Sequence, residues 1–203
     1  MKKILIKALI GSFTLLALVS AVKFFGKAPD DLTAAPENIP FIEVSDPANP
    51  NPSPSLPSYT GEAINMIGAD PIIRQLPAEA VARQKNFLAE LAESFKNGPL
   101  QYDEWIAVGV HKKFFNNYIG SRDAWEYAKL IEPRALRAYL NLADLHGYYL
   151  RDFSKAEVNF IAATERDFNN AVGSYHALAA FYRDFRVREK AIEYYKKVLE
   201  FNP

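Results

Sequence analysis

Large apolar residues recur along the second half of the chain at the spacing of paired helices. They stand at Trp105, Tyr139 and Tyr175, which lie 34 and then 36 residues apart. In each copy, further apolar residues follow at three- and four-residue steps, which is the period of an amphipathic helix. Later in each copy, a second set of apolar residues with the same period indicates a second helix. A repeat of this length predicts a row of helix–turn–helix units.

Small residues mark the positions where the two helices of each copy are expected to cross. In chain order these residues are Gly109, Ser121, Ala143, Ala156, Ala179 and Ala191. The large residues around the crossings are predicted to form the core, and they are Trp105, Trp125, Tyr139, Phe160, Tyr175 and Tyr195. Proline suits the end of a second helix, where the loss of a backbone donor is harmless. It stands there at Pro133 and Pro203.

The middle copy departs from this pattern in two places. Phe168 stands where the terminal proline of the other copies falls, and one extra residue separates Tyr139 from Ala156. We expect the extra residue in the turn near Arg151 and Asp152. These departures change the local geometry and leave the assignment of a repeat unchanged.

The pattern resembles the tetratricopeptide repeat (TPR) family. The resemblance covers residues 102–203, about half of the chain, with copies at 102–135, 136–171 and 172–203. It implies an all-α fold, an α-solenoid of three TPR helix pairs that stack because no pair buries its apolar face alone. It also implies that the chain binds other proteins and carries out no chemistry of its own.

A further amphipathic helix is predicted before the repeats, over residues 78–98. Its apolar face consists of Val81, Leu88, Leu91 and Phe95, with Phe87 adjoining. Pro77 suits the start of this helix, and the Gly98-Pro99 pair ends it. Gln84 is the one polar residue on the apolar face, so its amide needs water or a partner. The helix matches no repeat, and we interpret it as an N-terminal cap over the first repeat.

Proline and acidic residues characterise the segment before that helix, residues 28–77. Eight of the thirteen prolines fall between Ala28 and Tyr59, and the segment holds seven acidic residues against Arg74 alone. Proline disfavours helices and central strands, and few apolar side chains are available to offset the entropy of ordering. We therefore expect a disordered, acidic linker that acts as a spacer. Its last part, residues 61–75, carries a short apolar stretch and is a candidate for an extended arm against the folded domain.

Residues 1–27 form a basic, hydrophobic leader with two candidate roles. Five lysines and no acidic residue surround an uncharged run from Ala8 to Val22. As a signal-anchor or transmembrane helix, the leader supplies about 22 residues, enough to cross a bilayer. As a signal peptide, it offers the small residues Val19-Ser20-Ala21 for cleavage.

Both roles place the repeats outside the cytoplasmic membrane. The lysines nearest the N-terminus outweigh those after the apolar run, which favours a cytoplasmic N-terminus. We expect a single-pass protein of the cell membrane with extracytoplasmic repeats. The alternative is a secreted or periplasmic protein after cleavage of the signal.

The composition argues against several classes of function. The formal net charge is zero, which argues against a nucleic-acid partner, because phosphate binding requires a basic surface. The chain has no cysteine, so disulfides and sulfur-ligated metals are excluded. His111, His146 and His176 are scattered and match no metal-binding spacing. With no nucleophile motif and no phosphate-binding glycine loop, the sequence predicts neither an enzyme nor a cofactor.

In the TPR family the first helix of each repeat lines a concave groove that binds a peptide or protein. The resemblance implies that the groove of this chain includes Ile106, Val110, Lys113, Phe114, Arg137, Leu140, Asn141, Asp144, Tyr148, His176 and Arg183. Aliphatic, aromatic and mixed-charge side chains suit an extended peptide or a partner helix. Asn141 is the only amide that matches the carboxylate clamp of chaperone-binding members, so that clamp is absent. An ordinary solvated surface is the alternative interpretation of these residues.

The last repeat offers a second candidate surface. No polar helix follows Pro203, whereas the ends of solenoids usually carry one. We therefore expect another copy or a partner to cover Ile192, Tyr195, Val198 and Leu199.

Two functions follow from these surfaces. The first is a membrane-tethered TPR adaptor or scaffold that binds a protein or peptide outside the cytoplasmic membrane. The alternative is a structural subunit of a cell-envelope assembly that self-associates, as a homo-oligomer, through its uncapped C-terminal repeat.

Overall fold

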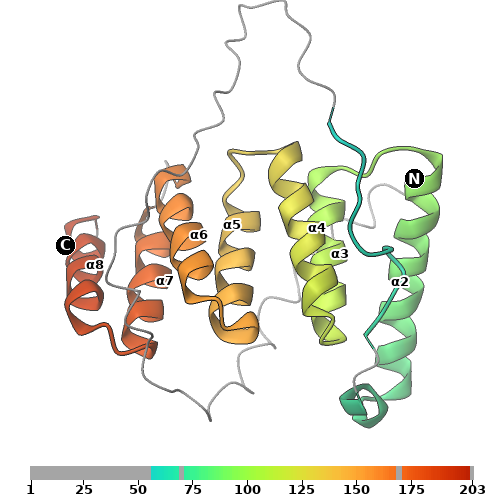
Figure 1. Ribbon diagram of the computed structural model, residues 1–203, viewed down its shortest axis with the longest axis horizontal. Helices are drawn as coiled ribbons and strands as arrows, with labels where there is room; N and C mark the ends of the chain where they lie inside the picture. Colours follow the sequence, from blue (N-terminus) through green and yellow to red (C-terminus); the bar gives the residue numbers. More distant parts are fainter. Residues whose placement is uncertain (1–55, 69–70, 168–170, 202–203) are drawn as a thin grey trace, which may run out of the picture.

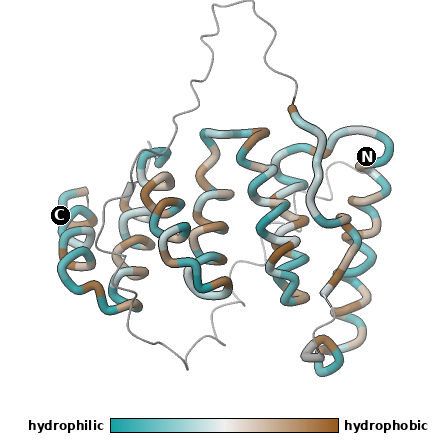
Figure 2. The backbone as a smooth tube through the Cα atoms, in the orientation of Figure 1, coloured by the Kyte–Doolittle hydropathy of each residue, from teal (hydrophilic) through white to brown (hydrophobic). Residues whose placement is uncertain are grey.

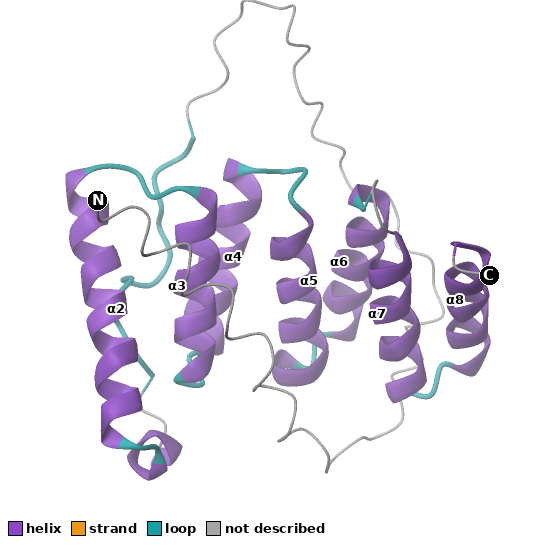
Figure 3. Ribbon diagram, turned by 180° about the vertical axis from the view of Figure 1, so that it is seen from behind, coloured by secondary structure: helices purple, strands orange, loops and turns teal. Residues whose placement is uncertain are grey.

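The computed structural model describes residues 56–68, 71–167 and 171–201, and every regular element within these ranges is a helix (Figure 3). The α-helices are α2 (Ala78–Asn97), α3 (Tyr102–Phe114), α4 (Tyr118–Ile131), α5 (Leu136–Asp144), α6 (Phe153–Arg166), α7 (Ala171–Asp184) and α8 (Arg188–Phe201). A 3-10 turn, η2 (Pro71–Gln75), precedes α2, and a π-helical segment, η3 (Leu145–Leu150), continues α5. The predicted all-α fold is therefore confirmed for the described residues.

The helices stand side by side in one row, with α2 at one end and α8 at the other (Figure 1). Each helix from α2 onward packs against the next in chain order. The pairs α3–α4, α5–α6 and α7–α8 are the three helix pairs that the repeat pattern predicts. In Figure 2, hydrophobic and hydrophilic positions alternate along the helices, as expected when one face of each is buried. The row is the arrangement of an α-solenoid.

The leader and most of the predicted linker, residues 1–55, lie outside the described residues. Within the part of the chain that the structure describes, no helix combines the length and the apolar character needed to span a bilayer. The hydrophobic N-terminal helix and the disordered linker up to residue 55 therefore stay predictions.

A residue in the left-handed conformation follows the first helix of every pair. These residues are Asn116, Arg151 and Arg186, with φ of 54°, 58° and 62°. They lie 35 residues apart in both steps, so the turns and the second helices keep a constant period. The three turns are built alike, although their sequences differ.

The extra residue of the middle repeat lies in its first helix, and our prediction that it lies in the turn is wrong. The large residue that begins the repeat and the left-handed residue are twelve positions apart here, and eleven positions apart in the other two repeats. The helix takes up the additional residue by widening to π geometry in η3. Sequence spacing does not separate the two placements, because both keep the second helix in phase.

All six small residues at the predicted crossings are buried. Four of the six predicted large core residues are also buried, namely Trp105, Trp125, Tyr139 and Phe160. The prediction is wrong for Tyr175 and Tyr195, which are only half-buried. Both belong to the last helix pair, and within the described residues no further helix packs beyond α8.

Helix α2 packs against the first repeat, as predicted for a capping helix. Its apolar residues Val81, Phe87, Leu88, Leu91 and Phe95 all belong to or pack against the core cluster of that repeat. Gln84, the polar residue on this face, pairs through Oε1 with Nδ1 of His111 on α3. Phe87 stacks on the same imidazole, with 4.2 Å between ring centroids. The buried amide thus has the partner that its position requires.

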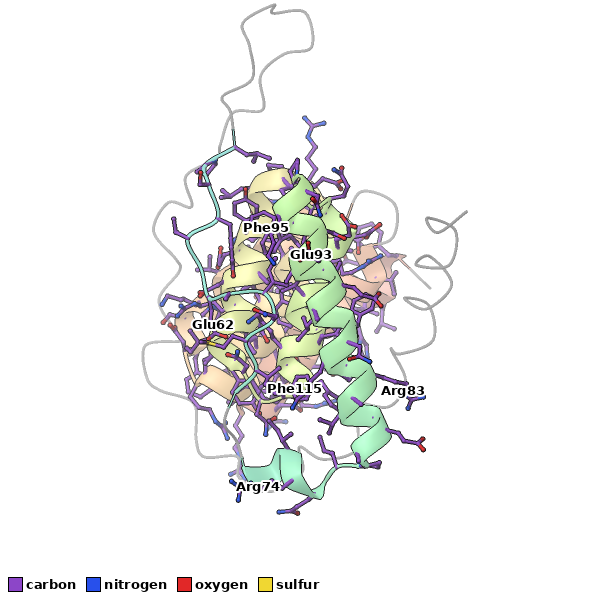
Figure 4. All side chains as sticks on the ribbon, turned by 90° about the vertical axis from the view of Figure 1, so that its right-hand side faces the viewer. Glu62, Arg74, Arg83, Glu93, Phe95 and Phe115 are labelled. Atoms are coloured by element: carbon purple, nitrogen blue, oxygen red, sulfur yellow. The ribbon has the colours of Figure 1, made fainter. Side chains whose placement is uncertain are left out.

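Residues 56–68, which we call the strap, run beside α2 against the first repeat (Figures 1 and 4). The Tyr59 ring lies 4.4 Å from that of Trp105, and Tyr127 donates a hydrogen bond to the Pro57 carbonyl. Ile64 is buried in the same cluster. The linker predicted over residues 28–77 is corrected accordingly, since its part from residue 56 to 68 belongs to the folded domain. Over residues 61–68, the extended arm suggested by the apolar stretch is confirmed.

Candidate protein-interaction site

Polar contacts join the first helices of successive pairs to one another. The contacts are Arg137 to Asp103 (3.1 Å) and Lys113 to Asp144, between α5 and α3, and Tyr148 to Asp184 (2.9 Å), between η3 and α7. Because they bridge neighbouring first helices, α3, α5, η3 and α7 present one continuous surface. We call this surface the first-helix face.

The predicted groove residues reach this surface with one exception. Ile106 is 3% exposed and belongs to the core, and its carbonyl accepts the indole N–H of Trp125 at 3.1 Å. It is unable to contact a partner, so this part of the prediction is wrong. The other ten residues are exposed or half-buried, and they are Val110, Lys113, Phe114, Arg137, Leu140, Asn141, Asp144, Tyr148, His176 and Arg183.

The charged residues of the first-helix face are mostly engaged with one another. Arg183 donates to Asp184 at 2.7 Å and to the Tyr195 hydroxyl at 3.2 Å. Lys113, besides its ion pair, lies over the Tyr149 ring at 4.2 Å. Val110, by contrast, is an apolar side chain with 43% of its surface exposed. The face therefore offers a partner apolar contacts set among neutralised charges.

The π-helical segment directs two adjacent tyrosines to opposite neighbours. Tyr149 lies 4.9 Å from Tyr118 of the first repeat, measured between ring centroids. Tyr148 lies 5.5 Å from Phe185 of the third repeat. One turn of helix thus joins the middle repeat to both of its neighbours. Because π-helical segments are frequent at functional sites, Tyr148 and Tyr149 mark the centre of the candidate surface.

Electrostatics keep Tyr148 in its protonated form. Burial raises its pKa, and the charge and hydrogen bond of the Asp184 carboxylate raise it further. The hydrogen bond and charge of the same carboxylate also raise the pKa of the Arg183 guanidinium. Tyr148 therefore stays neutral and Arg183 stays positively charged near neutral pH, and both hydrogen-bond to Asp184.

The three histidines lie in different surroundings. Across the described ranges, no group of His, Asp and Glu side chains is placed to hold a metal ion. His146 is buried, and burial lowers the pKa of both His111 and His146. His176 is exposed, with its ring edge-on to Tyr195. Two of these three residues therefore contribute to the packing between helices.

The largely buried His111 makes stability depend on pH. Burial lowers its pKa to about 4 in the folded chain, whereas an unfolded histidine titrates near 6.5. Between these values the unfolded state binds more protons, so the free energy of unfolding falls as the pH falls from 6.5 towards 4. We expect a loss of about 2 kcal/mol between pH 7 and pH 5 from His111 alone. Urea denaturation at a series of pH values measures it.

The control for this prediction separates His111 from the other titrating groups. His111→Asn keeps a polar partner for Gln84 and should flatten this part of the pH profile. His176→Asn replaces an exposed histidine and is the matched control. Identical profiles for the wild-type chain and His111→Asn would contradict the prediction.

The comparison with known families agrees with the geometry of the last helix pair. Residues 172–203 match the family model described as a tetratricopeptide repeat. The α7–α8 pair is a tetratricopeptide repeat. TPRs in general mediate protein–protein contacts, and the family is not in general enzymatic. For α3–α4 and α5–α6, the 35-residue period of the turns and the buried small residues carry the resemblance. No curated protein and no solved structure matches the chain.

The outer face of this TPR is open within the described residues. Its predicted end-face residues, Ile192, Tyr195, Val198 and Leu199, are all exposed or half-buried. At the position of Tyr195, the first two helix pairs carry Trp125 and Phe160, which are 1% and 4% exposed. In those pairs the next helix of the row packs against the second helix. The open face of α8 is therefore the place where a further helix would continue the row.

The contact between the strap and Lys112 was not predicted from the sequence. Lys112 stands where the other two repeats carry His146 and Tyr182, and it is 0% exposed. Its ammonium donates to the Glu62 carboxylate at 2.9 Å. A lysine at a core position was the available signal, since a buried charge requires a counter-charge. Nothing in the spacing identifies which acidic residue supplies it.

Proposed function

We propose that this chain is a membrane-tethered adaptor that binds a peptide or protein on its first-helix face, outside the cytoplasmic membrane. The observation that carries the proposal is the continuous surface of α3, α5, η3 and α7, held together by contacts between first helices. The TPR at residues 172–203 supports a protein partner. The basic, hydrophobic leader supports the tether and its orientation.

Binding in this proposal is non-covalent. Val110 and the half-buried aromatic residues of the face receive apolar side chains of the partner, since such anchors dominate the energy of most interfaces. Asn141 and Arg183 lie on the same first helices and can hydrogen-bond its backbone. The tether then holds the bound partner at the membrane, which raises its effective concentration for other membrane proteins.

A photo-cross-linking experiment tests the binding surface. The full chain is expressed in its own cells with a photoreactive amino acid in place of the exposed His176, and the products are identified by mass spectrometry. Val110→Asp is then compared with Leu130→Asp on α4, because the two apolar side chains are 43% and 41% exposed. We expect Val110→Asp to reduce the partner product about tenfold, since losing one anchor costs more than about 1 kcal/mol.

The Leu130→Asp variant is the control for this experiment. Leu130→Asp places the same charge on a second helix and should leave the product unchanged. Equal yields from both variants, whether reduced or not, would mean that Val110 is not an anchor for the partner. No partner product from position 176 would contradict binding on the first-helix face.

The second candidate function is a structural subunit that self-associates through the end face of Ile192, Tyr195, Val198 and Leu199. It is favoured by one observation, the 65% exposure of Leu199 on a face that is covered in the preceding pairs. The same experiment with the photoreactive residue at Leu199 distinguishes it. A product of twice the mass of the chain, lost in Ile192→Asp, supports self-association, and a product with a different protein does not.

A further inference from the structure

The strap contacts the first repeat in the way that a peptide contacts its receptor. Figure 4 looks onto this end of the row, where the strap with Glu62 runs beside α2 with Phe95. The strap contains no regular secondary structure. Most of its polar contacts come from side chains of α3, α4 and the turn between them.

Lys112 on α3 makes the central contact. Its ammonium donates to three acceptors of the strap, which are the Glu62 carboxylate (2.9 Å), the Ala63 carbonyl (2.8 Å) and the Met66 carbonyl (2.9 Å). An ammonium has three N–H groups, so each of them donates to one acceptor of the strap. The lysine stem is enclosed as well, since a Cβ added at Gly120 would lie 2.7 Å from its Cδ.

Glu62 is recognised through both its side chain and its backbone. Asn117 donates from Nδ2 to the same carboxylate oxygen, and Asp123 accepts the Glu62 amide N–H at 3.3 Å. Asn117 is itself held in place, because its Oδ1 accepts the Gly120 amide at the start of α4. A neutral or basic residue in place of Glu62 would leave the buried Lys112 without its hydrogen-bonded ion-pair partner. The position therefore selects a carboxylate.

Apolar contacts hold the strap on either side of this ion pair. The Tyr59 ring lies among three aromatic rings from three helices, with centroid distances of 4.4 Å to Trp105, 5.3 Å to Tyr127 and 6.4 Å to Phe95. Burial raises the pKa of Tyr59. Ile64 is 4% exposed. The aromatic pocket and the burial of Ile64 add shape to the charge recognition.

Among the remaining strap residues, Ile67 is half-buried and packs against the core of the first repeat, and most of the others contribute little side-chain surface. Leu56, Pro57, Ser58, Thr60, Ala63, Asn65 and Met66 are all exposed. Recognition thus rests mainly on an aromatic residue, a glutamate three positions later, and aliphatic residues two and five positions after the glutamate. Contacts to backbone carbonyls add affinity without adding specificity, as in other extended peptides bound by proteins.

We propose that the surface formed by α2, α3 and α4 beneath the strap is a second peptide-binding site, and that the strap is its resident ligand. The site takes an extended segment of another protein with the same order of aromatic, acidic and aliphatic residues. Strap and partner compete, so the site opens only when the strap leaves. This inference does not depend on the first-helix face, because the two surfaces share no residue.

The covalent connection between strap and α2 sets the strength of the competition. A segment tethered by a short linker acts at an effective concentration on the order of millimolar. A free peptide of the same sequence at micromolar concentration should therefore not displace the strap of the wild-type chain. Weakening the strap removes this protection.

The test uses the full chain with Tyr59→Ala and Glu62→Ala, which weakens the strap and keeps every residue of the site. The probe is a fluorescent synthetic peptide of residues 56–68, and fluorescence anisotropy measures its binding. We expect the variant to bind this peptide at least about 100-fold more tightly than the wild-type chain does. A peptide with the same two alanine replacements should not bind. Adding Lys112→Met to the variant should abolish binding of the unmodified peptide.

Three results would overturn the proposal. The first is a folded variant, by circular dichroism, that does not bind the peptide. The second applies if the variant does not fold, and it comes from hydrogen exchange of the wild-type chain. Faster exchange of the Glu62 and Met66 amides than of the α3 amides supports a strap that opens, and equal protection overturns the proposal. The third is exchange of straps between differently labelled wild-type copies with dimer formation, because the occupant is then a second copy.

Discussion

Replacing Gly109 with alanine is expected to destabilise the chain by about 3 kcal/mol, at the upper end of the usual cost of overpacking a core. The added Cβ would lie 2.1 Å from Nε1 and 2.4 Å from Cε2 of Trp125. Trp125 is 1% exposed, and its indole N–H donates to the Ile106 carbonyl at 3.1 Å. Because the ring is enclosed and bonded to α3, the two helices have to move apart to admit the methyl group.

Urea denaturation followed by tryptophan fluorescence measures this effect, since both tryptophans of the chain lie in the first repeat. Gly173→Ala is the matched control. An added Cβ at Gly173 meets nothing within 4 Å outside its own helix among the described residues. Alanine favours the helix over glycine, so we expect a gain of up to about 1 kcal/mol. A Gly109→Ala variant as stable as the wild-type chain would contradict the close crossing of α3 and α4.

The helix pairs were predictable because a helix crossing limits side-chain size, and this limit recurs with the repeat. Gly109, Ala143 and Ala179 occupy equivalent places on three first helices, and all three are buried. The capping helix was predictable for a different reason, since its apolar face repeats at helical spacing. Its end at Asn97 agrees with the Gly98-Pro99 signal.

The strap was only partly predictable, because its contacts join residues far apart in the chain. Lys112 and Glu62 are 50 positions apart, and no local pattern relates them. Tyr59, Glu62 and Ile64 anchor a segment that otherwise has the composition of a linker. The average composition of the segment therefore gives no sign of these contacts. The π-helical segment escaped prediction in the same way, because one added residue has the same effect on the register in a helix as in a turn.

The sequence indicated where the first-helix face lies, but not which of its side chains contact one another. Helical periodicity places Lys113 and Tyr148 on first helices, whereas the contacts of Lys113 with Asp144 and of Tyr148 with Asp184 depend on the register between helices. Ile106 shows the limit of the family pattern, since its position in the repeat predicted exposure and the packing around α3 buries it.

Replacing Glu62 with alanine is expected to destabilise the chain by about 3 kcal/mol, at the lower end of the cost of breaking a buried ion pair. The side chain of Lys112 is 0% exposed and that of Glu62 is 23% exposed, so the lysine is the partner that water is unable to reach. Burial already lowers the pKa of Lys112, and Glu62 opposes this. Without the carboxylate, the ammonium has to lose its proton or the strap has to detach.

Lys112→Met is expected to cost less than Glu62→Ala, because it leaves a carboxylate that is partly exposed and still accepts from Asn117. The double variant should lose less than the sum of the two single losses, by about 1–3 kcal/mol. Urea denaturation of the four chains gives this coupling energy directly. Additive losses would show that the two side chains act independently.

Which of the two single substitutions costs more stability also shows which contacts hold the strap. A larger loss from Glu62→Ala means that the strap is retained mainly to supply a counter-charge to Lys112, and a glutamate from any well-fitting segment meets that requirement. A larger loss from Lys112→Met means that packing of the lysine stem between α3 and α4 dominates, because that contribution disappears with the side chain. In that case the apolar contacts of Tyr59 and Ile64 hold the strap, and the charge contributes selectivity more than affinity.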